Sequence, residues 1–504
     1  MAAPSGGARP GRAAGTGLPV PVQSAPSGPA FITSLAGGGT GYFADQHGNP
    51  RFLLGDNPWA LIPNAGRWAG TYQSDIDTYC DTRGGQGFTG VYLDPLGNTE
   101  LNGAFPDGRT WDGVFPFTVN GVAGSTASLA GTETIGLNSA FWTRVDYFIA
   151  GCARNGMTAM LNVGTNGPGD FDTGAALTVM TPAQFSQYGA ALAARYAATQ
   201  NIIWMVGNDY FGGTGGTFGA DGGTPANADS QYASLHSGLS GGGDAHLFGV
   251  HNYAESDSRE DLGTGTTGTV QYTGNNFSSF NGNYTYNLTY LGIEDAYGEA
   301  SPVPVMQLDG YFYQGGPTYE GGSGAFAFDR AFRQDAWQAV TSGARGHVSG
   351  SEGVWEWGSG ALAQVQTGWY YVNNAAAIRT LTESLPNWYS LIPDTGNVLI
   401  TGGRGTRAST FVSGGSGGQY EVSFANTYVS ASRCADKSLA ILYFPSAATI
   451  TIDQSQMVAG YKAYWADPVT GTMTLTTSGS SYNSASPGSN SQGDPDWVLV
   501  LKAP

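Results

Sequence analysis

The sequence predicts an α/β fold: a (β/α)8 TIM barrel followed by a C-terminal antiparallel β-sandwich domain. The chain has 504 residues, enough for a barrel of about 250 residues and a smaller module. From Phe31 to about Asn397, short apolar β-rich runs alternate with amphipathic helical stretches, as in a parallel sheet covered by helices. After Asn397, short apolar runs are separated only by turn residues, which is typical of a sandwich.

Eight apolar segments are the expected barrel strands, and most of them end in polar residues, as the carboxyl face of a barrel requires. They are Phe52–Gly55, Gly90–Leu93, Thr158–Val163, Ile202–Val206, His246–Val250, Phe277–Phe280, Val303–Leu308 and Gly346–Val348. Helices are expected at Ser74–Gly84, Ser139–Asn155, Thr181–Thr199, Ala327–Gly343 and Asn374–Leu385. Thr181 suits an N-cap, and Pro182 suits the first helical position.

These patterns divide the chain into three parts. Residues 1–30 are expected to be a disordered Pro/Gly-rich tail, residues 31–396 the barrel, and residues 397–504 the sandwich. Asp467–Gly471 carries a hairpin signal. The expected sandwich strands are Val398–Ile400, Tyr420–Phe424, Leu439–Tyr443, Ala448–Ile452, Lys462–Trp465 and Trp497–Leu501.

The composition restricts the class of partner. The formal net charge of −18 disfavours nucleic acid and anionic membranes as partners, whereas an uncharged polysaccharide is compatible with it. Charged residues make up 12% of the chain and aromatic residues 12%, with 79 glycines, which indicates long ordered loops and aromatic platforms, not disorder.

The three cysteines give no sign of a metal centre. Cys80, Cys152 and Cys434 lie far apart and have no histidines at ligand spacing, so we expect no metal and no other cofactor. Two alternatives remain for them, buried free thiols or at most one disulfide.

The sequence has no apolar run long enough to span a membrane, and its first residues lack the apolar region of a signal peptide. We expect a monomer that acts outside the cell after secretion. Association with a virion tail is the alternative, because no signal peptide is visible.

Two carboxylates follow expected barrel strands. Asp209 ends the apolar run that starts at Asn201, and Glu320 lies between the strand Val303–Leu308 and the next helix. These are the ends of strands four and seven, which face each other across a barrel mouth. Glycoside hydrolysis uses such a pair, one as the acid and the other as the nucleophile or base. Taken singly, each carboxylate also fits a structural role; together they predict catalysis.

In order along the chain, several segments resemble the apiosidase-like glycoside hydrolases, whose barrel precedes a module labelled as collagen-binding. The resemblance covers about residues 40–502, through Tyr42–Trp59, Asp77–Phe88, Asn201–Asp209, Pro317–Gly321, Ala331–Trp357, Gly471 and Asp496–Leu501. It implies Asp209 as the general acid/base and Glu320 as the nucleophile. We favour a retaining mechanism, with the carboxyl groups about 5–5.5 Å apart; about 6.5–9.5 Å would indicate inversion.

The sequence departs from the family pattern at two places. It has Gly207-Asn208-Asp209 where the family commonly has Gly-Gly-Asp, and Gly315-Gly316-Pro317 where the family tends to have Gly-Glu-Pro. The second change removes a carboxylate near the site. The resemblance therefore implies hydrolysis of furanoside or side-chain sugars in a plant or microbial cell-wall polysaccharide, but not apiose in particular.

Other residues at the expected mouth are candidates for binding the sugar. Tryptophan faces can stack on sugar rings, and polar side chains can bind hydroxyl groups. Each type also has a structural role, because tryptophans often fill cores and histidines often lie in loops. Strand alternation would place Trp355 and Trp357 on one side. The candidates are Asp56, Trp59, Asp94, Asn162, Asn208, His251, Tyr313 and Trp355.

A second hypothesis keeps the barrel without turnover, as a glycan-binding protein such as a phage tail or adhesin component. The glycine at position 316 and the long inserted loops motivate this hypothesis. Collagen binding by the C-terminal module is a third, suggested only by the family label. Loss of cleavage with retained binding in Asp209→Ala and Glu320→Ala variants would separate the enzyme from the binding protein.

Overall fold

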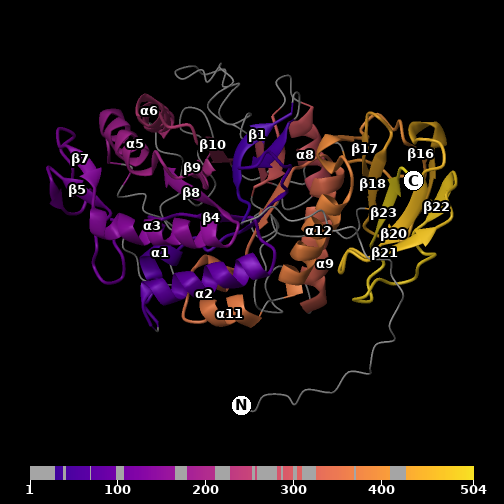
Figure 1. Ribbon diagram of the computed structural model, residues 1–504, viewed down its shortest axis with the longest axis horizontal. Helices are drawn as coiled ribbons and strands as arrows, with labels where there is room; N and C mark the ends of the chain where they lie inside the picture. Colours follow the sequence, from indigo (N-terminus) through magenta and orange to yellow (C-terminus); the bar gives the residue numbers. More distant parts are fainter. Residues whose placement is uncertain are drawn as a thin grey trace, which may run out of the picture.

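The computed structural model describes residues 29–37, 41–68, 70–97, 107–164, 177, 179–210, 228–252, 256–257, 281–284, 288–298, 303–308, 325–367, 370–408 and 427–504. Most of the predicted tail, residues 1–28, lies outside these ranges. Figure 1 shows a parallel sheet wrapped by helices beside a layer of antiparallel strands near the C-terminus. Among the described helices, none is both long and apolar enough to cross a bilayer.

Eight parallel strands form the larger part, in the sheet order β10-β9-β8-β4-β3-β14-β13-β12. Counted along the chain this is 5-4-3-2-1-8-7-6, the circular order of a (β/α)8 barrel. β10 and β12 lie within 8 Å between Cα atoms, but no ladder joins their described residues. The predicted barrel is therefore confirmed in part, as a curled, TIM-barrel-like sheet that is not fully closed. The strands are β3 (Leu53–Asp56), β4 (Gly90–Leu93), β8 (Thr158–Gly164), β9 (Ile202–Tyr210), β10 (Leu247–Asn252), β12 (Asn281–Tyr284), β13 (Val305–Gln307) and β14 (Gly346–Ser349).

The sixth strand differs from the prediction. The expected range Phe277–Phe280 lies outside the described residues, and the strand in sixth place is β12, with the sequence Asn-Gly-Asn-Tyr. β12 pairs in parallel with β13 and antiparallel with the short β11 (Ser256–Asp257). Such a polar sequence carries no hydrophobic signal, and the prediction therefore falls on the apolar run before it.

The five predicted helices are present, with shifted ends. α5 begins with Thr181 as N-cap and Pro182 at its start, and the side chain of Gln184 completes a capping box. The predicted helices are α2 (Tyr72–Gly85), α3 (Ser139–Arg154), α5 (Pro182–Tyr196), α9 (Ala325–Thr341) and α12 (Tyr370–Ser384). Further helices are α1 (Leu61–Asn64), α6 (Ala228–Gly241), α8 (Thr289–Tyr297), α10 (Glu352–Trp355) and α11 (Ala361–Thr367).

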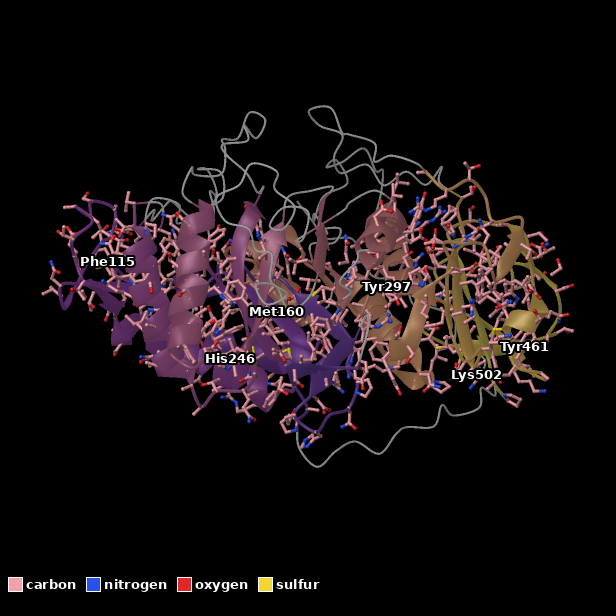
Figure 2. All side chains as sticks on the ribbon, turned by 90° about the horizontal axis from the view of Figure 1, so that it is seen from above. Phe115, Met160, His246, Tyr297, Tyr461 and Lys502 are labelled. Atoms are coloured by element: carbon pink, nitrogen blue, oxygen red, sulfur yellow. The ribbon has the colours of Figure 1, made fainter. Side chains whose placement is uncertain are left out.

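Alternation along the parallel strands separates two hydrophobic layers. Side chains on one face of the strands gather in an inner cluster, and those on the other face pack against the helices. Met160, an inner residue of β8, lies among the strands of the barrel part in Figure 2. The inner cluster includes Leu53, Trp59, Tyr92, Met160, Ile203, Met205, Met306, Leu308 and Val348.

Small sheets extend the barrel part. β1 and β2 pair antiparallel, and β5, β6 and β7 form a three-stranded sheet between β4 and α3. Their bounds are β1 (Ile32–Ala36), β2 (Tyr42–Asp45), β5 (Phe117–Val119), β6 (Val122–Ala123) and β7 (Ile135–Leu137).

Two antiparallel sheets form the C-terminal part, with the orders β15-β17-β18-β23-β20-β21 and β16-β19-β22. A hydrophobic cluster that includes Leu442, Ile450 and Trp465 lies between them, and the opposite face of the larger sheet joins the cluster that packs on the barrel helices. The strands are β15 (Leu391–Pro393), β16 (Ile400–Gly402), β17 (Ser430–Cys434), β18 (Leu439–Phe444), β19 (Thr449–Ile452), β20 (Lys462–Ala466), β21 (Met473–Thr476), β22 (Ser481–Asn483) and β23 (Trp497–Lys502). The short 3-10 turns are η2 (Trp388–Ser390) and η3 (Gln454–Gln456).

The predicted strand at Tyr420–Phe424 lies outside the described residues. β15, β17, β21 and β22 were not predicted. Each is short, and in β17, β21 and β22 the Ser and Thr residues also weaken the apolar pattern. The three cysteines are buried free thiols, so of the two alternatives the first is confirmed.

Candidate active site

The fourth barrel strand carries Asp209. β9 runs through Asn208 and Asp209 to Tyr210, which places the backbone of both residues at the carboxyl end of the strand. Their side chains lie outside the described part. Glu320 and Tyr313 also lie outside it, in the connection that follows the seventh strand, β13.

A side chain on the neighbouring strand holds the backbone just before Asn208. Asn162 on β8 is buried, and its Nδ2 donates to the carbonyl oxygen of Gly207 at 2.5 Å. Gly207 has a φ of +87°, a conformation that favours glycine. The pairing of β8 with β9 shifts register between Asn162 and Gly164. The chain therefore bends at Gly207, and Asn162 restrains that bend.

Three aromatic rings meet edge to face at the carboxyl end of the sheet. The centroids of Trp59 and Tyr92 are 5.1 Å apart, those of Tyr92 and His251 are 5.5 Å apart, and those of Trp59 and His251 are 6.2 Å apart. All three residues are buried. The structure therefore brings together two predicted site residues from the ends of strands one and five.

Tyr92 joins this group but was not among the predicted site residues. It lies in the middle of β4, whose residues read as an ordinary apolar strand. Its inward position follows from alternation with the outward residues Val91 and Leu93. That alternation was the signal that could have identified it.

Asp94 lies beside the same aromatic group. It is buried, and its Oδ1 accepts a hydrogen bond from the backbone N–H of Leu96 at 2.8 Å. A Cβ atom at Gly97 would lie 2.8 Å from the Cβ of Asp94 and 2.9 Å from the indole of Trp59. Glycine at this position thus allows the loop after β4 to close onto Trp59. Burial, followed by the negative charge of Asp94, raises the pKa of Tyr188.

Asp56 makes its described contacts on the opposite side of its strand. Leu53 belongs to the inner cluster and Leu54 to the helix-facing layer, so alternation turns Asp56 toward the helices. Its Oδ2 accepts from the Nε of Arg83 at 2.6 Å and from the hydroxyl of Tyr79 at 2.9 Å, both from α2. Asp56 therefore anchors α2 on β3, and its contact with a sugar stays a prediction.

The expectation that Trp355 and Trp357 share one side is wrong. β14 ends at Ser349, and Trp355 is the last residue of the helix α10. Trp355 packs against the inner cluster, whereas Trp357 belongs to the helix-facing layer and has a φ of +48°. The strand period does not apply here because the chain is no longer extended.

Within the part of the chain that the structure describes, no three His, Cys, Asp or Glu side chains are placed to hold a metal ion. The mouth is instead built from amide, aromatic and carboxylate groups at the ends of strands one to five. Such groups can stack on a sugar ring and bind its hydroxyls.

Two family models match this chain. The model described as "Apiosidase-like, catalytic domain" matches residues 39–396, and the one described as "Putative collagen-binding domain of a collagenase" matches residues 421–502. No curated protein matches the chain.

Solved structures share the fold at low sequence identity. A glycoside hydrolase of family 5 from Bacteroides vulgatus ATCC 8482 is 16% identical with a TM-score of 0.68, over 94% of this chain and 92% of that one. A structure named "Glycoside hydrolase" is 15% identical with a TM-score of 0.66, over 94% of this chain and 97% of that one. At these identities the likeness shows the fold alone. The catalytic-domain model covers more than half of the length of this chain, so the chain belongs to the apiosidase-like family and is a glycoside hydrolase.

Proposed function

We propose that this glycoside hydrolase cleaves furanoside or side-chain sugars from a plant or microbial cell-wall polysaccharide, using Asp209 as the general acid/base and Glu320 as the nucleophile of a retaining mechanism. The observation that carries the proposal is the position of Asp209 at the carboxyl end of the fourth strand of a TIM-barrel-like sheet, within the family match. Glu320 belongs to the connection after the seventh strand.

The described surroundings of the mouth support a sugar as the ligand. Trp59, Tyr92 and His251 form a rigid aromatic wall, because each ring packs edge to face on the other two. The Oδ1 of Asn162 is buried without a hydrogen-bond partner in the described part of the chain, so it can accept a bond from a hydroxyl group. A neutral ligand suits a chain of net charge −18.

In the proposed reaction, Asp209 protonates the oxygen of the leaving group while Glu320 attacks the anomeric carbon. Water then hydrolyses the glycosyl-enzyme, with Asp209 as the base. The acid must hold its proton at the working pH, and the nucleophile must be ionised. We propose that the chain works outside the cell as a monomer, since a cell-wall polymer cannot enter a cell.

The test is a screen of sugars released from plant pectin and bacterial arabinogalactan, with Asp209→Asn and Glu320→Gln beside the wild type. We expect release by the wild type and a loss of at least about 10³-fold in each variant. Asp77→Asn is the matched control, because Asp77 is a partly exposed carboxylate on α2 that binds Arg154; it should retain full activity.

Three results would overturn this proposal or part of it. Full activity in either carboxylate variant would remove that residue from its role, and a product of inverted anomeric configuration by NMR would exclude retention. A wild type that binds these polysaccharides but releases no sugar would favour the alternative, a glycan-binding protein.

A further inference from the structure

Two tryptophans on the surface stand apart from the other aromatic residues. Trp68 is 45% exposed and Trp111 is 39% exposed, and they are the two aromatic members among the exposed large hydrophobic side chains of the described residues. Water contact with so much apolar ring surface is unfavourable. Exposed aromatic groups of this kind often mark a binding surface.

Both indoles are held in place by their polar edge. The Nε1 of Trp68 donates to the carbonyl oxygen of Trp357 at 3.2 Å, and the Nε1 of Trp111 donates to that of Ala65 at 3.0 Å. The backbone N–H of Trp111 also donates to the carbonyl oxygen of Pro63 at 2.9 Å. Because each N–H is already bonded inside the protein, the rings have set orientations and present apolar surface to solvent. Little side-chain entropy is therefore lost when a ligand binds to them.

Their place in the fold is the rim of the barrel mouth. Trp68 lies between α1 and α2 in the connection after β3, and Trp111 lies in the connection after β4. Both connections leave the carboxyl ends of the strands, the face at which β9 carries Asp209. Trp111 also packs its main chain and side chain on residues 63–65, only a few positions before Trp68. The two indoles thus share one stretch of the rim.

Polar groups flank the rings. The guanidinium carbon of Arg67 lies 4.6 Å from the ring centroid of Trp68. Asp112, next to Trp111, accepts from the Nη2 of Arg144 at 2.6 Å and from the hydroxyl of Thr110 at 2.5 Å. Burial raises the pKa of Asp112, and these hydrogen bonds lower it by more than burial raises it. The pKa therefore lies below its ordinary value, and the carboxylate stays a hydrogen-bond acceptor. The rim therefore offers apolar faces with a donor and an acceptor beside them.

We propose that Trp68 and Trp111 form a glycan platform on the rim, which binds an uncharged stretch of the polysaccharide away from the bond that is cleaved. An aromatic face flanked by hydrogen-bonding groups fits the apolar face and the hydroxyls of a sugar ring. The inference rests on the proposed function for the class of ligand. Figure 2 places Phe115, from the same connection as Trp111, at the end of the molecule opposite the C-terminal sheets.

The test compares Trp68→Ala, Trp111→Ala and the double variant with the wild type in affinity electrophoresis through gels that contain pectin, arabinogalactan or xylan. We expect the wild type to be retarded by at least one polymer, and the double variant to bind that polymer about tenfold more weakly. Leu475→Ala is the matched control, because Leu475 is 64% exposed on β21 of the C-terminal part; its retardation should equal that of the wild type.

Activity and chemical protection separate a platform from a structural role. The double variant should cleave a small aryl glycoside with unchanged kcat and KM, while its KM for the polymer rises about tenfold. N-bromosuccinimide should oxidise Trp68 and Trp111 in the free protein, and the bound polymer should protect both, as measured by mass spectrometry.

The inference is overturned if no polymer retards the wild type, if the double variant binds as well as the wild type, or if it loses activity on the small glycoside. These outcomes are distinct from failure of the proposed function. Active carboxylate variants would refute the assigned catalytic pair and leave the polymer-binding result intact.

Discussion

The barrel mouth and the contact between α9 and the C-terminal sheets bury polar groups in different ways. At this contact, which we call the seam, Arg333 of α9 bonds Asp494 at 2.6 Å and Asp496 at 3.0 Å. The hydroxyl of Tyr443 donates to Asp496 at 3.1 Å. At the mouth, Asn162 and Asp94 instead bond backbone groups, the carbonyl oxygen of Gly207 and the N–H of Leu96.

The charged groups of the seam stabilise the fold, whereas the groups at the mouth are suited to binding a ligand. A buried guanidinium between two carboxylates needs its partners, since removing one charge leaves the others without compensation. Figure 1 shows α9 between the barrel strands and the C-terminal sheets, so the pairing joins the two parts. Buried amides and aromatic rings carry no net charge, so the carboxylate of Asp94 is the charged member of this described group, and the neutral members suit a sugar.

The largest effect is expected at the seam. Arg333→Ala leaves Asp494 and the fully buried Asp496 without their cation, and it should lower the free energy of unfolding by about 3–5 kcal/mol. Urea denaturation measures this loss. Arg154→Ala is the control, because Arg154 bonds Asp77 at 2.6 Å on the exposed surface and should cost at most about 1 kcal/mol. Equal losses in the two variants would contradict the comparison.

At the mouth, the expected effect is on catalysis more than on stability. Asn162→Ala removes the donor that restrains the carbonyl of Gly207, two residues before Asp209. A small displacement of a catalytic group can cost about 100-fold in rate, so we expect kcat to fall about 100-fold. KM should also rise, because the Oδ1 that can accept from a sugar hydroxyl is lost. Stability should fall by about 1–3 kcal/mol, because a buried carbonyl loses its partner.

Asn201 provides a matched control just before β9, at the opposite end of that strand from Gly207. Its Nδ2 donates to the carbonyl oxygens of Ile149 at 3.0 Å and Met157 at 3.3 Å. Asn201→Ala should lower stability by a similar amount and leave kcat unchanged. If both variants lose kcat equally, Asn162 has only a structural role.

The sequence predicted the barrel better than its site because the two depend on different information. Apolar runs predict strands such as β4 and β8, and the N-cap Thr181 predicts the start of α5. The direction of a side chain at the end of a strand is harder to predict from the sequence. Asp56 and Trp59 lie three residues apart, yet one contacts α2 and the other the inner cluster.

Contacts between segments distant in the sequence were beyond prediction for the same reason. Asn162 and Gly207 are 45 positions apart, and Arg333 and Asp496 are 163 apart. Nothing local in either residue signals its partner; only the parallel pairing of β8 with β9 and the docking of α9 bring them together. Asn162 was predicted as a sugar ligand, and its role in restraining the chain before Asp209 appeared only in three dimensions.

The smallest effect is a dependence on pH at the seam. Burial raises the pKa of Asp329 to about 7, against the positive charge of Arg333 and a hydrogen bond from Gln492. In the unfolded chain the pKa is about 3.9, so the folded state holds the proton more tightly and loses stability as the pH rises from about 4 to 7. Asp329→Asn should remove this loss and raise stability above pH 7, and this gain should vanish below about pH 4.

Thermal unfolding of both proteins at several pH values measures this gain. Asp453→Asn is a control of opposite sign, because hydrogen bonds from Ser455 lower the pKa of Asp453 and its contribution is present above the unfolded pKa. That variant should lose stability at pH 8, and the loss should disappear as the pH falls. If Asp329→Asn shows the same gain at every pH, the pKa of Asp329 is not raised in the folded state.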